Sequence, residues 1–307
     1  MSLEPVSFKD RNAISKLEEL VADPKVAKIQ IVDARNALFD RTITVTDRPE
    51  LTIEGLDNGT VIRPAGDFDV FRFKAPLSRC KLRNLQFLDN PEKPAHRSAS
   101  MICFDHSGNH DQINEFTLEN ICMYYPFNGV YMPDRSWDIR NSVQKLTVQN
   151  VNINQYRNVA FNICNCFDTV FNIVFAGQYN NNANHAFAMR NCLDSGNYVY
   201  KATMLGSGNP KGNGFHLDNV SHLQGAGWIS DSMKNGIATL NEVDDVAVAT
   251  AEVRASSDSG INVSHKKGIL VIGILIAQNN KQYHIYDQRL GGKVEIQRCL
   301  YSENPPV

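Results

Sequence analysis

Residues 148–175 read VQNVNINQYRNVAFNICNCFDTVFNIVF, and two short patterns alternate in this stretch. The first pattern, apolar-x-Asn-apolar-x-apolar, starts at Val148 and again at Val170. The second, small-apolar-x-apolar-x-Asn, starts between them at Ala160. Apolar residues at every second position indicate β-strands, because successive side chains of a strand point to opposite faces. This stretch therefore predicts two short strands in each repeat.

The same two patterns recur along most of the chain. Clear copies of the first also start at Leu82 and Leu118, and weaker copies extend from Ile53 to Ile296. A copy of the second pattern falls between each successive pair, and the repeats are about 22 to 36 residues long, which is typical of solenoids. Two strands per repeat, separated by polar turns, predict an all-β parallel β-helix of about ten coils. Equivalent positions of successive coils would then stack about 4.8 Å apart.

Asparagines recur at fixed positions of both patterns and are expected to stack from coil to coil. An asparagine tolerates the left-handed conformation of a turn, and its amide can bond to equivalent amides on either side. We expect one internal row at a bend of the first pattern and a second row at the end of the second pattern. The two rows are Asn84, Asn120, Asn150 and Asn172, and Asn165, Asn191, Asn219 and Asn241.

Composition and charge argue against some classes of function. The chain has 307 residues, a net charge of −2 and 42% hydrophobic residues. No apolar run approaches the roughly 18 residues of a membrane span, and no basic excess indicates a nucleic-acid partner. The N-terminus lacks the apolar segment of a signal peptide.

The ends of the chain differ from its middle. Ile14, Leu17, Leu20 and Val21 have helical spacing, so residues 1–25 are expected to be a leader and a short capping helix. Residues 26–302 are expected to form the β-helix, and residues 303–307 a C-terminal tail. The last repeat has no evident cap, which predicts association into a homo-oligomer.

These alternating strands, asparagine rows and N-terminal helix resemble the right-handed parallel β-helix proteins of the pectin-lyase-like superfamily. The resemblance implies a polysaccharide partner and an activity that cleaves or modifies it, by β-elimination or glycosidic hydrolysis. The alternative is a non-enzymatic glycan-binding or structural solenoid, such as a phage tail or surface module. Phage tailspikes belong to this superfamily, so the resemblance also suggests a trimer and leaves a virion-associated or extracellular location open.

The motifs of the best-known enzymes of this superfamily are missing, so the resemblance assigns no catalytic residue. The strand pattern itself indicates a candidate cluster, in which Arg190 and Asp218 share one outward column on adjacent coils and His216 lies on the same face. An arginine can neutralise a uronate carboxylate, and a histidine can transfer protons near neutral pH. We predict His216, Arg190 and Asp218 as catalytic residues.

Other residues near this face are expected to contact the substrate. Asp105 and Asp134 end strands on successive coils, Tyr131 and Trp137 offer aromatic faces for sugar rings, and His185 belongs to a polar loop. Three long segments, at about residues 88–100, 176–185 and 205–213, are expected to wall a groove over this strand row. The spacing of histidines and carboxylates predicts no metal site and no cofactor, although a calcium requirement is left open.

Overall fold

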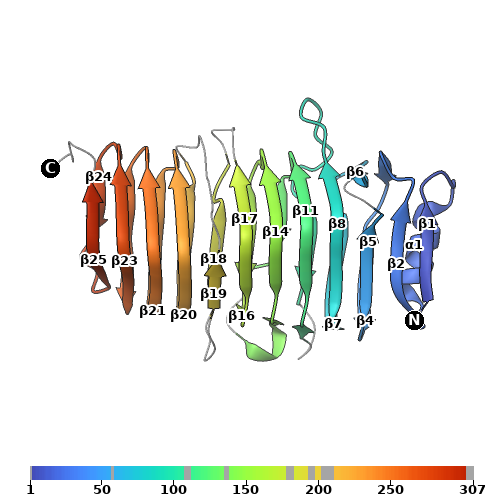
Figure 1. Cartoon of the computed structure of the whole chain (residues 1–307), viewed down its shortest axis with the longest axis horizontal. Helices are drawn as coiled ribbons and strands as arrows, with labels where there is room; N and C mark the ends of the chain where they lie inside the picture. The colour runs from blue at the N-terminus through green and yellow to red at the C-terminus, as the bar shows by residue number, and fades with distance from the viewer. Residues whose placement is uncertain are drawn as a thin grey trace.

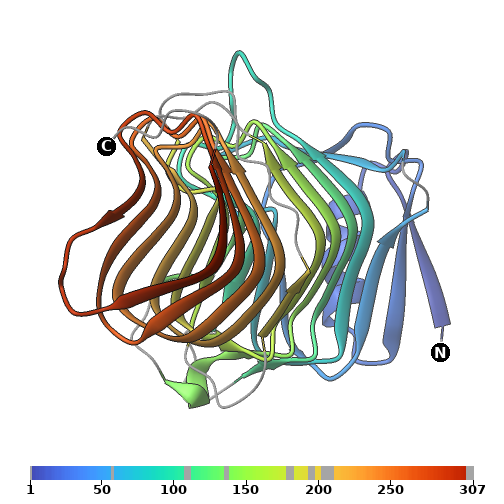
Figure 2. The ribbon, with the colours of Figure 1, turned by 60° about the vertical axis from the view of Figure 1, so that its left-hand side comes forward.

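The computed structural model describes residues 2–56, 59–106, 112–134, 138–177, 183–192, 198–201 and 211–301. The chain is a parallel β-solenoid of about 11 turns with one helix near the N-terminus. The strands lie side by side in chain order in Figure 1, and the coils stack behind one another in Figure 2. The predicted parallel β-helix is therefore confirmed, with about one more coil than expected.

The longest series of paired strands contains the first sequence pattern, and every pairing in it is parallel. Its members in spatial order are β1 (Ser2–Ser7), β2 (Val26–Val32), β5 (Leu51–Gly55), β8 (Cys80–Leu88), β11 (Thr117–Tyr124), β14 (Thr147–Asn154), β17 (Val170–Gly177), β19 (Tyr198–Lys201), the later parts of β20 (Asn213–Asp231) and β21 (Asn235–Arg254), β23 (Ile269–Gln278) and β25 (Lys293–Tyr301).

A second parallel series contains the second pattern and carries five of the predicted site residues, namely Asp105, Tyr131, Arg190, His216 and Asp218. It consists of β4 (Ile43–Arg48), β7 (Phe71–Ser78), β9 (Ser100–Asp105), β12 (Asn128–Tyr131), β15 (Val159–Cys164), β18 (Phe187–Cys192), the early parts of β20 and β21, β22 (Ser259–Lys267) and β24 (Tyr283–Asp287). Short strands complete the coils at the corners, namely β3 (Ala37–Phe39), β6 (Val61–Pro64), β10 (Ile113–Asn114), β13 (Val143–Gln144) and β16 (Cys166–Phe167), with a 3₁₀ helix at Ile139–Asn141.

Side chains at alternate positions fill the interior of the solenoid. In β7 the buried and exposed residues alternate almost without exception, as the period-two pattern requires. Phenylalanines from neighbouring coils pack on one another, and the ring centroids of Phe73 and Phe116 are 4.5 Å apart. Steric hindrance explains why the second pattern begins with a small residue. A Cβ on Gly129 would lie 2.5 Å from the carbonyl oxygen of Ala160 on the next coil.

Helix α1 (Ala13–Ala22) lies beside the first coils and buries Ala13, Leu17 and Val21. The buried guanidinium of Arg48 holds its end, since Arg48 donates to the carbonyl oxygens of Leu20, Val21 and Val26. Residues 2–7, which the sequence placed in a leader, form strand β1 and pair with β2. Within the described residues, no helix has the length and apolar character needed to cross a membrane.

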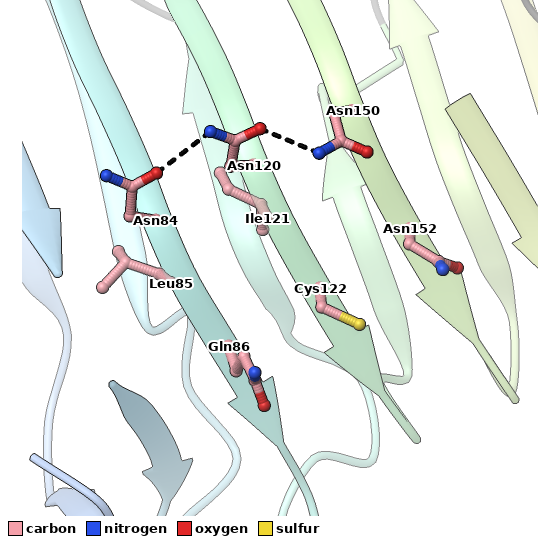
Figure 3. A pocket seen from close by; sticks show the side chains of 8 residues that line it. All are labelled: Asn84, Leu85, Gln86, Asn120, Ile121, Cys122, Asn150 and Asn152. Carbon is pink, nitrogen blue, oxygen red and sulfur yellow. Dashed lines mark hydrogen bonds between the residues drawn. The ribbon is translucent and has the colours of Figure 1, made fainter. Parts of the chain in front are cut away.

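The first asparagine row differs from the prediction in two ways. Asn84, Asn120 and Asn150 have φ angles of 56°, 53° and 51° and are joined by amide hydrogen bonds of 3.1 and 2.8 Å, but their side chains lie on the outer surface (Figure 3). Each left-handed residue bends the strand directly before a buried residue, namely Leu85, Ile121 or Val151, and its own side chain points outward. Asn172 is not part of the row, because it pairs with Gln149 and the left-handed position of β17 belongs to Ile173.

The second asparagine row is less uniform than expected, although all four members have φ between 51° and 57°. Asn219 donates to Asn191 at 3.0 Å, whereas Asn241 donates to Asp218 at 2.6 Å. Asn165 is completely buried, and its amide bonds to backbone groups of Asp138 and Asn141. These asparagines have the same backbone conformation, but their side chains have different hydrogen-bond partners.

Candidate functional site

Four of the predicted site residues line one groove on the second strand series. We call it the histidine groove, and its volume is about 350 Å³. Its lining consists of Tyr131, Asp134, Asn158, Val159, Asn162, Asn184, His185 and Arg190. The groove crosses β12, β15 and β18, so three consecutive coils contribute side chains to it.

An ion pair crosses the groove between Arg190 and Asp134. Arg190 Nη1 lies 2.7 Å from Asp134 Oδ2, and both side chains remain partly exposed. Asn162, on the coil between them, donates from Nδ2 to Asp134 Oδ1 at 3.1 Å and accepts from Arg190 Nη1 at 3.3 Å. Asn162 is only 2% exposed, and its Nδ2 also donates to the carbonyl oxygen of Met132. The buried amide therefore fixes both members of the ion pair.

Strand register places Tyr131, which lines the groove, and His216, which does not, in one outward column. Tyr131 pairs with Asn162, Asn162 with Ala188, and Ala188 with His216. The three coil steps set the backbones of Tyr131 and His216 about 14 Å apart. Ala188 is fully buried although it belongs to the outward column, so neighbouring side chains cover the floor between the two ends.

Two histidines stack at the end of this column. The ring centroids of His185 and His216 are 4.3 Å apart with planes inclined by 10°. Asn213 lies next to both rings, because its backbone nitrogen is 3.3 Å from His185 Nδ1 and its Nδ2 is 3.3 Å from His216 Nδ1. Both contacts exceed the usual 2.7–3.2 Å of hydrogen bonds from N–H, so they engage the Nδ1 lone pairs weakly.

The surroundings keep this histidine pair neutral. Burial, the neighbouring His216 ring and Arg190 lower the pKa of His185 to about 3. Burial, followed by the charge of Arg190, also lowers the pKa of His216, although Asp218 and Asp134 oppose the shift. Tyr131 is also kept neutral, since burial and then Asp134 raise the pKa of its phenol. At neutral pH the groove presents neutral imidazoles and a protonated phenol.

Not all predicted residues join the groove. Asp218 pairs with Arg190 in strand register, but its Oδ1 accepts from Asn241 while Arg190 bonds to Asp134. In the structure Arg190 thus pairs with Asp134, and Asp218 bonds to Asn241. Asp105 ends β9 one coil before β12 and does not line the groove. Trp137 lies outside the described residues, as does most of the segment 205–213.

Sequence reasoning missed a row of asparagines at the start of the second strand series. Asn158 Nδ2 donates to Asn128 Oδ1 at 2.7 Å, Asn184 donates to Asn158, and Asn235 Nδ2 donates to Asn213 Oδ1 at 2.9 Å. Asn158 and Asn184 form one wall of the histidine groove. The signal was present in the sequence, since an asparagine stands one or two residues before the small residue of each of these repeats.

The described residues contain no cluster of three or more histidine, cysteine, aspartate or glutamate side chains that could hold a metal ion. The two charged residues of the described lining, Arg190 and Asp134, form an ion pair. The described lining thus offers proton-transfer groups and hydrogen-bonding amides rather than a set of metal ligands.

Comparisons with known proteins bear on the fold. No family model and no curated protein sequence matches the chain. Among solved structures, the chain resembles the A-module of the Azotobacter vinelandii mannuronan C-5 epimerase AlgE4 (TM-score 0.67, 11% identity, 99% of this chain and 98% of the other) and that of AlgE6 (0.59, 11%, 94% and 92%). It also resembles the enzymatically active domain of tailspike protein 2 of bacteriophage CBA120 (0.56, 10%, 98% and 47%). The chain therefore has the parallel β-helix fold shared by these pectate-lyase-like proteins.

Proposed function

We propose that this protein binds an acidic polysaccharide in the histidine groove and modifies a uronate unit by removing the proton next to its carboxylate. The observation that carries the proposal is the joint presence of Arg190, a protonated Tyr131 and a neutral His185 in the lining of one groove, with a neutral His216 stacked on His185. The resemblance to two mannuronan C-5 epimerase modules supports the substrate class.

Arg190 is the group that would hold the substrate. Its guanidinium has five N–H donors, and the bonds to Asp134 and Asn162 both start from Nη1. A uronate carboxylate bound to this cation loses much of its negative charge. The neutralised carboxyl group can then accept the electron pair released when the adjacent C–H bond breaks, so the carbon acid becomes more acidic.

His216 and Tyr131 would transfer the protons. His216 is neutral at neutral pH because its pKa is lowered, so its weakly engaged Nδ1 accepts the proton. Tyr131 keeps its own proton because its pKa is raised, so it serves as the donor. Return of a proton to the opposite face of the carbon gives the epimer. Expulsion of the neighbouring glycosidic oxygen, with a proton supplied to it, gives β-elimination instead.

Glycosidic hydrolysis fits the groove less well. Most glycoside hydrolases use two carboxyl groups that flank the scissile bond. Among the described lining residues Asp134 provides the one carboxylate, and it is paired with Arg190. The geometry therefore favours proton abstraction over hydrolysis.

The test is incubation of the protein with polymannuronate and with polygalacturonate in D₂O. Deuterium at C5 with an intact chain identifies epimerisation, and an absorbing unsaturated uronate identifies elimination. His216→Ala and Arg190→Gln should each lower the rate at least about a hundredfold. New reducing ends without a double bond or deuterium would replace the proposal by hydrolysis.

The alternative is a binding module without catalysis, which the resemblance to the enzymatically active tailspike domain does not favour. Uronate binding without deuterium exchange or cleavage would establish it.

A homo-oligomer also remains a proposal, supported by the exposed Tyr283, Tyr286 and Leu300 of the β24–β25 coil. Light scattering at micromolar concentration tests it, and a 34.4 kDa particle would reject it.

A further inference from the structure

A second groove crosses the first strand series, away from the histidine groove. We call it the amide groove. It spans β8, β11 and β14 and has a volume of about 370 Å³. The side chains of Asn84, Asn120, Asn150, Gln86, Cys122 and Asn152 line it, as Figure 3 shows. None of the reactions considered above uses these residues.

The three left-handed asparagines form a polarised chain of amides. Asn150 Nδ2 donates to Asn120 Oδ1, and Asn120 Nδ2 donates to Asn84 Oδ1. The row therefore has an amide nitrogen at its Asn84 end and a carbonyl oxygen at its Asn150 end, as Figure 3 shows. Each of these bonds uses one of the two N–H groups of its donor amide and one of the two lone pairs of its acceptor oxygen. Donors and acceptors thus repeat at the spacing of the coils, about 4.8 Å.

The lining carries no formal charge. Its accessible side chains are amides and a thiol, because Leu85 and Ile121 are each only 1% exposed. Burial raises the pKa of Cys122, so this thiol is neutral at neutral pH. An anionic ligand such as a uronate finds no cation among these residues, and a metal ion finds no carboxylate. A neutral ligand with paired donors and acceptors matches the lining.

The backbone of this region excludes a peptide strand as the matching ligand. Peptides that add to a sheet bond to unpaired N–H and C=O groups at its edge. Strands β8, β11 and β14 are interior strands that pair with neighbours on both sides. Only side chains remain to recognise a ligand. Sugar hydroxyls each donate and accept at once, so they fit a row that offers both.

We propose that the amide groove is a second glycan site that binds a neutral, hydroxyl-rich oligosaccharide without reacting with it. The ligand runs across the coils, and successive sugar units exchange hydrogen bonds with Asn84, Asn120 and Asn150. This site is independent of the function proposed for the histidine groove.

The first experiment measures binding of single neutral hexasaccharides by calorimetry, with β-1,4-glucan, β-1,4-mannan and α-1,4-glucan hexamers as probes. Asn120→Gly removes the central amide, and glycine accepts the φ of 53° without strain. We expect at least one hexamer to bind, and Asn120→Gly to weaken it at least about tenfold. Asn219→Gly is the matched control, since Asn219 has a φ of 54° and an amide bond to Asn191 but lies outside the groove.

The second experiment uses Cys122 as a reporter in a Cys299→Ser background. The remaining cysteines, Cys80, Cys103, Cys164, Cys166 and Cys192, are buried. A bound hexamer should slow alkylation of Cys122, and Asn152→Ala, a second lining variant, should remove this protection. Absence of binding by all three hexamers, equal binding by Asn120→Gly, or loss of binding in His216→Ala would each overturn the proposal.

Discussion

The imidazole rings of His185 and His216 stack face to face 4.3 Å apart, and a single residue, Asn213, contacts the Nδ1 atom of each. A positive charge on either ring would be repelled by Arg190 and would be poorly hydrated. The stack therefore favours the neutral form of both rings. The stability of the folded protein should then depend on pH in the acid range.

We expect the free energy of unfolding to fall as the pH drops below about 6.5, the ordinary histidine value, and to keep falling toward pH 3. Over this range the unfolded chain binds a proton at His185, whereas folded His185, whose pKa is about 3, does not. His185→Gln should make the slope against pH shallower by about one proton. Tyr131→Phe, in the same groove, should leave the slope unchanged. Urea denaturation at a series of pH values measures both, and an unaltered slope in His185→Gln would contradict the assignment.

Asn162 is expected to act as a positioning residue for Arg190 and Asp134. Asn162→Ala should reduce kcat/KM for the uronate substrate about 10- to 100-fold, because the guanidinium loses its fixed orientation. The loss should fall mainly on KM if Arg190 binds the carboxylate. Asn280→Ala is the control, since Asn280 is also buried and hydrogen-bonded but lies far along the chain. Equal losses of activity in both variants, in step with their melting temperatures, would reduce the role of Asn162 to folding.

Arg48 is expected to anchor the N-terminal helix. Arg48→Met leaves the carbonyl oxygens of Leu20, Val21 and Val26 without their donor and should cost about 2–4 kcal/mol. Arg41 also links α1 to the first coils, through Glu18, but its side chain is 43% exposed. Arg41→Met should therefore cost less than about 1 kcal/mol. Equal urea midpoints for the two variants would show that Arg48 is not an anchor.

The asparagines should differ in their contribution to stability. Asn165→Ala loses three hydrogen bonds in a buried site and should cost about 1–3 kcal/mol more than Asn150→Ala, which loses one bond at the surface. Both positions have φ near 52°, so the conformational penalty of alanine is shared and cancels in the comparison. Thermal denaturation of the pair gives the difference, and the reverse order would refute this explanation.

The fold could be predicted because each coil repeats the same two strand patterns. A pattern that recurs at equivalent positions indicates that successive coils stack on one another. The prediction was wrong at Asn172, where apolar residues on both sides allow two alignments one residue apart. The pattern VFNIVF fits the motif from Val170, but the chain places Phe171 where Leu82 lies in its coil, so Ile173 takes the left-handed position. The register of a strand is set by its pairing with the neighbouring coils, so it could not be predicted from the local sequence alone.

The strand pairing of the candidate residues could be predicted, because strand register follows from the repeats. Ala188 and His216 are paired as the columns predicted, as are Arg190 and Asp218. Register does not determine where a long side chain ends. Arg190 reaches back to Asp134, on the far side of Asn162, rather than sideways to Asp218. That choice depends on the buried amide of Asn162, whose role cannot be inferred without coordinates.

The last coils of the solenoid repeat with a constant step. Val246 pairs with Leu270 and Leu270 with Val294, while Ile237 pairs with Ile261 and Ile261 with Ile285, a step of 24 residues on both strand series. Removal or duplication of one such 24-residue unit is expected to keep these paired inward side chains in their columns. The molecule can thus be shortened or lengthened in whole coils at this end, while the irregular coils that carry the histidine groove stay unchanged. The number of coils at this end is therefore expected to be independent of the reaction in the histidine groove.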